Sequence, residues 1–86
     1  APYQINDGNN GSWVFTQVDK STYAIWIPGS KPTTAVTLDL AAAFPLNKFS
    51  KVKALNPGNY CSIKKDYLQI GLGTNKLNTP QVFKLQ

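Results

Sequence analysis

Apolar residues recur at every second position in several short runs of this 86-residue chain, and one run is denser than the others. In residues 21–30, Ala24 and Trp26 fall on one side of an extended chain, and a tyrosine and two isoleucines fall on the other. Strands that are apolar on both sides are usually covered on both sides, and β-branched and aromatic residues favour strands. The pattern therefore predicts a central strand that ends at Pro28-Gly29.

Weaker runs with the same alternation predict further strands on both sides of the central one. They cover residues 3–6, 12–18, 33–40, 49–55, 60–63, 67–72 and 81–85. The short polar segment 19–21 predicts that 12–18 and the central strand form an antiparallel hairpin. Asn56-Pro57-Gly58-Asn59 predicts a turn, because proline presets one φ and glycine supplies a positive one. Ala41–Phe44 could form one helical turn before Pro45 ends it, and no longer helix is expected.

The number and spacing of these strands predict the fold class. Seven to eight short strands with regular turns are typical of an all-β protein, and we predict an antiparallel β-sandwich, with a small β-barrel as the alternative. The chain is long enough for one domain and too short for two, so residues 1–86 are expected to form a single sandwich domain. The composition agrees, because the good helix formers Arg, Glu and Met are absent from the sequence.

The side chains available disfavour catalysis. The chain has no His, so the usual proton shuttle at neutral pH and the commonest metal ligand are missing, and Cys61 has no activating base. Three of the four aspartates fall in expected turns and do not suggest a facing catalytic pair. Residues 7–11 superficially resemble a calcium loop but lack its further acids and its bidentate Glu. We expect no enzyme activity, no catalytic residue, no cofactor and no metal site.

The net charge of +5 comes from nine basic residues, all lysines. Lys48, Lys51 and Lys53 lie close together and could attract single-stranded nucleic acid, but lysine lacks the planar fork that grips phosphate bidentately. Nucleic acid is therefore the least favoured partner. No segment approaches the roughly 18 apolar residues of a membrane span, so no membrane partner is expected. Low charge together with abundant Asn and Thr leads us to expect a secreted, extracellular protein.

Aromatic and amide side chains indicate carbohydrate as the ligand. Sugars present flat C–H faces ringed by hydroxyls, so their sites combine exposed aromatic rings with hydrogen-bonding side chains. The candidate ligand-binding residues are Trp13, Asn9, Asn10, Tyr3, Trp26 and Tyr60. Trp13 is the best candidate platform because it follows an Asn-rich loop at a strand end, where binding loops cluster. Trp26 is expected to belong to the packed interior or to a docking face.

Four runs, taken in order, resemble parts of a known family. Residues 22–27, 35–40, 52–58 and 79–83 are similar to successive strands of the C-terminal β-sandwich domains of glycoside hydrolases. The resemblance implies a non-catalytic accessory domain that packs against a catalytic barrel and sometimes contributes to polysaccharide binding. It carries over no catalytic residue, because the carboxylates of that family lie in a different domain.

Three functional hypotheses follow. The first is a non-catalytic, carbohydrate-associated, lectin-like module that binds a glycan through exposed aromatics. The second is a structural or protein-interaction domain whose apolar outer face, at Tyr23–Ile27, docks on a catalytic or other partner domain. The third is a lysine-driven binder of single-stranded nucleic acid. Solvent exposure of Trp13 and Trp26 discriminates between the first two, because indoles covered by a second sheet serve only as scaffold.

Overall fold

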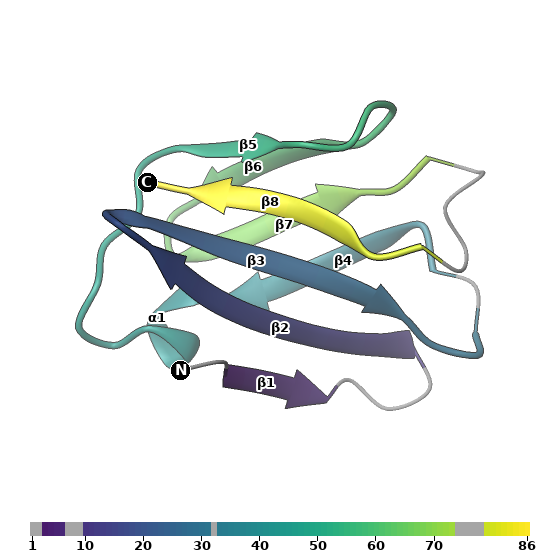
Figure 1. Ribbon diagram of the computed structural model, residues 1–86, viewed down its shortest axis with the longest axis horizontal. Coiled ribbons are helices and arrows are strands. Elements are labelled where there is room, and N and C mark those ends of the chain that lie inside the picture. Colours follow the sequence, from purple (N-terminus) through teal and green to yellow (C-terminus); the bar gives the residue numbers. More distant parts are fainter. Residues whose placement is uncertain (1–2, 7–9, 32, 74–78) are drawn as a thin grey trace.

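Two antiparallel β-sheets lie face to face in the computed structural model, which describes residues 3–6, 10–31, 33–73 and 79–86 (Figure 1). The strands are β1 (Tyr3–Asn6), β2 (Gly11–Val18), β3 (Ser21–Pro28), β4 (Ala35–Asp39), β5 (Val52–Ala54), β6 (Tyr60–Lys64), β7 (Tyr67–Gly71) and β8 (Gln81–Leu85). One sheet has the order β1-β2-β3-β8-β5 and the other the order β4-β7-β6. The predicted antiparallel sandwich is confirmed. The alternative of a small barrel is wrong, because the described strands form two separate sheets and no closed barrel.

The predicted hairpin and the predicted central strand are both confirmed. β2 pairs with β3 along its whole length, from Gly11 opposite Pro28 to Val18 opposite Ser21. The two-residue connection begins with Asp19 at φ 56°, a left-handed conformation that Asp tolerates better than most residues. β3 is the middle strand of the five-stranded sheet, with β2 on one side and β8 on the other.

Two predicted strands are shorter than the sequence indicated. The strand expected at 49–55 is regular only over Val52–Ala54, because Ser50 and Lys51 both donate their N–H groups to the carbonyl of Gln86. Because two residues of this segment bond to a single residue of the neighbouring chain segment, the regular hydrogen-bond ladder is interrupted, as in a β-bulge. The strand expected at 33–40 ends at Asp39, whose carboxylate caps a single helical turn, α1 (Leu40–Ala43), by accepting the N–H of Ala42 at 3.1 Å.

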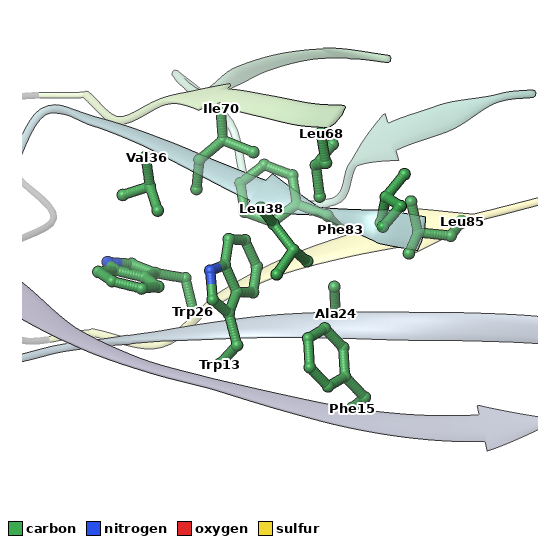
Figure 2. Packing of buried hydrophobic residues seen from close by; sticks show 11 residues of the cluster. Trp13, Phe15, Ala24, Trp26, Val36, Leu38, Leu68, Ile70, Phe83 and Leu85 are labelled. Atoms are coloured by element: carbon green, nitrogen blue, oxygen red, sulfur yellow. The ribbon is translucent and has the colours of Figure 1, made fainter. Parts of the chain in front are cut away.

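The core lies between the inner faces of the two sheets. Ala24 and Trp26 of β3 point inward, as do the buried residues of the neighbouring strands (Figure 2). The buried hydrophobic residues are Trp13, Phe15, Ala24, Trp26, Val36, Leu38, Leu40, Leu68, Ile70, Phe83 and Leu85. β4 and β8 show the alternation that predicted them, with Val36 and Leu38 buried on β4 and Phe83 and Leu85 buried on β8. β3 is covered by the three-stranded sheet on one side only, so its other apolar side faces outward.

The Asn56–Asn59 turn also makes hydrogen bonds to two distant segments of the chain, at Gly73 and at Gln81. Gly58 has φ 85°, as expected for a turn built on Pro-Gly. The amide of Asn59 donates to the buried Gln81 side chain at 2.6 Å, and its oxygen accepts the N–H of Gly73 at 3.0 Å. Gln81 in turn donates to the carbonyl of Thr79 at 2.9 Å. Asn59 and Thr79 together satisfy the oxygen and the nitrogen of a fully buried amide, which would otherwise be costly to bury.

Candidate functional site

The two tryptophans expected as ligand-binding residues lie in the core. Trp13 is 2% exposed and Trp26 is 0% exposed, and their ring centroids lie 5.2 Å apart in an edge-to-face arrangement. Neither indole presents a face to solvent, so the prediction that Trp13 is a stacking platform is wrong. The physical reason is strand parity, since Trp13 shares its face of β2 with the buried Phe15. Trp26 was expected in the packed interior or on a docking face, and it lies in the interior.

The remaining candidates are scattered. Asn9 and the side chain of Tyr3 lie outside the described part of the structure, as does most of the loop that resembles a calcium site. Asn10 is partly buried, and its carbonyl accepts the N–H of Gly29 at 3.0 Å, which ties the loop to the end of β3. Tyr60 is the one aromatic candidate that is open to solvent among the described side chains, at 74% exposed. It lies on β6, far in sequence from the other candidates.

The outer face of the three-stranded sheet carries Tyr60 and a second exposed tyrosine. Tyr60 is opposite Gly71 of β7, and a Cβ added to Gly71 would lie 2.2–2.6 Å from the Cζ, Cε1 and hydroxyl atoms of Tyr60. The phenol therefore lies across the Gly71 backbone. Tyr67, 44% exposed, belongs to the same face of the sheet at the other end of β7. We call this surface the tyrosine face. Sequence reasoning missed Tyr67 and the glycine beneath Tyr60.

Between the two tyrosines lies a row of uncharged polar side chains. Thr37, Gln69 and Ser62 are directly opposite one another on β4, β7 and β6, and all three are exposed. None of them makes a side-chain hydrogen bond to another of the described residues. Their hydroxyl and amide groups are therefore available to a ligand lying on the sheet.

The outer face of the five-stranded sheet carries an apolar row that crosses β2, β3 and β8 and continues past the end of β5. Val14, Ile25 and Val82 are opposite one another on β2, β3 and β8, and Leu55 continues the row by donating its N–H to the carbonyl of Val82 at 2.9 Å. These side chains are half-buried or exposed, and the adjacent Ile27 is 39% exposed. We call this surface the apolar face. It includes the outward side of β3, the strand that the sequence singled out as apolar on both sides.

Lysines border the apolar face at one side. Lys53 of β5 is directly opposite Lys84 of β8, which is itself opposite Tyr23 of β3. Lys51 is exposed two residues before Lys53. Within the described part of the chain no carboxylate pairs with these lysines. Like charges directly opposite on neighbouring strands repel, so a negatively charged partner at this border would relieve the repulsion.

A hollow at the α1 end of the sandwich offers little chemistry. It has a volume of about 260 Å³ and is lined mainly by the loop after α1, including Phe44, Leu46 and Asn47, with Lys65 and Asp66 at its edge. Among the described residues, no cluster of three or more His, Cys, Asp or Glu side chains could hold a metal ion. The hollow has neither a nucleophile with a base nor a pair of facing carboxylates.

Cys61 is the only thiol, and its surroundings reduce its reactivity. Burial between β5 and β6 raises the pKa of the thiol, and a hydrogen bond with the backbone of Ala54 opposes this rise only in part. The thiolate is the nucleophilic form, so a raised pKa lowers the reactive fraction at neutral pH.

Comparison with protein-family models, with curated proteins and with solved structures gives no match. None of the helices in the described residues is long and apolar enough to span a membrane. The candidate sites therefore rest on the geometry of the two outer faces.

Proposed function

We propose that this chain is a non-catalytic accessory module of a secreted carbohydrate-active protein, and that it docks on an adjoining domain through the apolar face. The observation that carries the proposal is the unbroken row of Val14, Ile25, Val82 and Leu55 on the outside of the five-stranded sheet. The resemblance of its strand sequences to the C-terminal sandwiches of glycoside hydrolases supports the carbohydrate context.

The pattern of the outer faces favours docking over a solvated surface. An antiparallel sheet with one face in water normally alternates apolar inward and polar outward residues. β4 follows this rule, since Ala35, Thr37 and Asp39 are exposed and Val36 and Leu38 are buried. β3 departs from it from its third residue on, because Tyr23, Ile25 and Ile27 all lie on its outward side. A contiguous apolar surface that is partly open to solvent is typical of an interface.

The lysine border indicates the chemistry of the partner surface. Lys51, Lys53 and Lys84 are exposed or half-buried beside the apolar row and have no acidic partner among the described residues. A complementary surface would be apolar at its centre with aspartate or glutamate facing the lysines, and such complementarity fixes orientation more than affinity. An adjoining domain with an acidic border fits this description.

The docking proposal is tested with 8-anilinonaphthalene-1-sulfonate, an anionic aromatic dye that matches an apolar surface bordered by lysines. The isolated 86-residue chain should bind the dye, and Ile25→Thr, which retains a β-branched residue, should weaken this binding. The matched control Thr37→Val lies on the other sheet and should leave the existing site unchanged. In the complete natural protein the adjoining domain should exclude the dye. Equal binding by the complete protein and by the isolated chain would overturn the proposal, and so would a concentration-dependent dimer seen by sedimentation.

A further inference from the structure

We propose that the tyrosine face binds a neutral polysaccharide, with Tyr60 as the stacking platform. This site lies on the opposite sheet from the apolar face, so it is independent of the docking function. A module docked through its five-stranded sheet would leave the three-stranded sheet open to a ligand. The sheet order and the exposure of both tyrosines carry the inference.

Gly71 determines how the ring of Tyr60 lies. Ring atoms of Tyr60 occupy the space that a Cβ at position 71 would need, so any other residue there would push the ring away from the sheet. Gly71 has no positive φ, so the glycine is required for space and not for backbone conformation. The ring is thus held against the backbone while 74% of the residue's surface remains open. A ring supported on one side and open on the other can stack on a flat sugar face.

Tyr67 extends the site along the sheet. It lies four residues before Gly71 on β7, which corresponds to about 13 Å along the strand at the usual rise per residue. That separation exceeds the size of one sugar ring, so the face suits an oligomeric ligand better than a monosaccharide. Thr37, Gln69 and Ser62 fill the interval with hydrogen-bonding groups at positions where sugar hydroxyls would lie.

The charges on this face favour a neutral ligand. In the row that contains Tyr67, Asp39 of β4 and Lys64 of β6 lie on either side and carry opposite charges. Asp39 also accepts the N–H of Ala42, which uses part of its acceptor capacity. A groove that tracks a phosphate backbone would require several cations in a line, and this face offers only one. Three of the nine lysines, Lys51, Lys53 and Lys84, lie instead at the border of the other sheet.

The test is binding of the intact 86-residue chain to a panel of neutral polysaccharides (cellulose, xylan, mannan, starch and a β-1,3-glucan), measured by affinity electrophoresis or by depletion onto the insoluble polymers. At least one polymer should retard the chain. Tyr60→Ala should weaken that interaction about tenfold, a loss of about 1.4 kcal/mol. Tyr60→Phe, which keeps the ring, should retain it. Gly71→Ala should weaken it as well, because the ring is displaced while remaining present.

Two controls separate this site from others. Leu46→Ala, at a residue 96% exposed on the loop after α1, should bind like the original chain. The Ile25→Thr variant, which changes only the apolar face, should bind polysaccharide as the original chain does. Loss of dye binding and loss of polysaccharide binding are then caused by different substitutions, so failure of the docking proposal and failure of this one are distinguishable. Absence of binding to every polymer would overturn the inference. Equal binding by Tyr60→Ala and the original chain would overturn it too, as would Tyr60-dependent binding of a thymidine oligonucleotide stronger than that of any glycan.

Discussion

Trp13 and Trp26 are directly opposite each other on β2 and β3, and their rings meet edge to face at the centre of the sandwich. Trp13 also contacts Phe83 of β8 at a centroid distance of 6.2 Å. Three neighbouring strands of the five-stranded sheet therefore contribute aromatic rings to one cluster (Figure 2). Such pairs contribute about 0.5–1.5 kcal/mol beyond the burial of their area. The tryptophans therefore stabilise the fold, and neither presents a ring face to solvent.

Replacement of Trp13 by alanine should lower the free energy of unfolding by about 3–5 kcal/mol, because it leaves a cavity and removes the ring contacts. Urea denaturation followed by circular dichroism measures the change. Leu46→Ala serves as the control and should alter stability by less than about 0.5 kcal/mol, because Leu46 is almost fully exposed. Tryptophan emission of the original chain should also resist quenching by iodide until urea unfolds it. Efficient quenching of the folded chain would contradict the burial of both indoles.

Alternation along the strands made most of the fold predictable. It grouped the inward residues Ala24 and Trp26 on one side of β3, because a buried strand face requires every second residue to be apolar. It could not decide which side of β3 is covered, since both sides are apolar and only the position of the second sheet distinguishes them. It also favoured the Trp13 platform on account of the neighbouring loop, although strand parity directs this side chain inward.

The candidate site was less predictable, because it depends on contacts between distant residues. Tyr60 was expected as a ligand-binding aromatic, but its support by Gly71 arises only from the register of β6 with β7. A glycine within an otherwise alternating strand was the available signal, since it often marks a close approach of another group. Asn59 was predicted as a turn residue, and its bond to Gln81 could not be predicted because 22 positions separate the two residues.

Replacement of Asn59 by alanine should destabilise the fold by about 1–3 kcal/mol, because the amide of the fully buried Gln81 loses the hydrogen-bond donor to its oxygen. The free energy of unfolding in urea measures this effect. Asn47→Ala is the matched control, since Asn47 is exposed on the loop after α1 and its side chain makes no hydrogen bond to another of the described residues. Equal stability of the two variants would show that water replaces Asn59 as the partner of Gln81.

Replacement of Gly11 by alanine should be more damaging than replacement of Gly58. Both glycines have positive φ angles, 150° and 85°, so both substitutions carry a conformational cost, about 1 kcal/mol for Gly58. At Gly11 the new Cβ would also lie 2.5 Å from the carbonyl oxygen of Ile27 and 2.6 Å from the ring of Trp26. Overpacking of this kind adds about 1–3 kcal/mol. The melting temperatures of the two variants test this order of destabilisation. A larger fall in melting temperature for Gly58→Ala than for Gly11→Ala would contradict it.

Cys61 should make the stability of the fold depend on pH on the alkaline side. Burial raises the pKa of its thiol above the ordinary value of 9.0, so the unfolded chain loses this proton at a lower pH than the folded chain does. The folded state therefore binds more protons than the unfolded state between the two pKa values, and its stability falls as the pH rises through that window. Below pH 9.0 the contribution is fully present.

The measurement compares the original chain with Cys61→Ala in urea denaturation between pH 8 and pH 11. The original chain should lose stability more steeply above pH 9 than the variant, because alanine at this position has no proton to release. Alkylation by iodoacetamide at pH 8 gives a second readout. The folded chain should react more slowly than the chain unfolded in urea, because fewer of its thiols are ionised and the sulfur is partly covered. Faster alkylation of the folded chain would mean that the thiolate is stabilised, and Cys61 would then be a reactive residue and not a packing residue between β5 and β6.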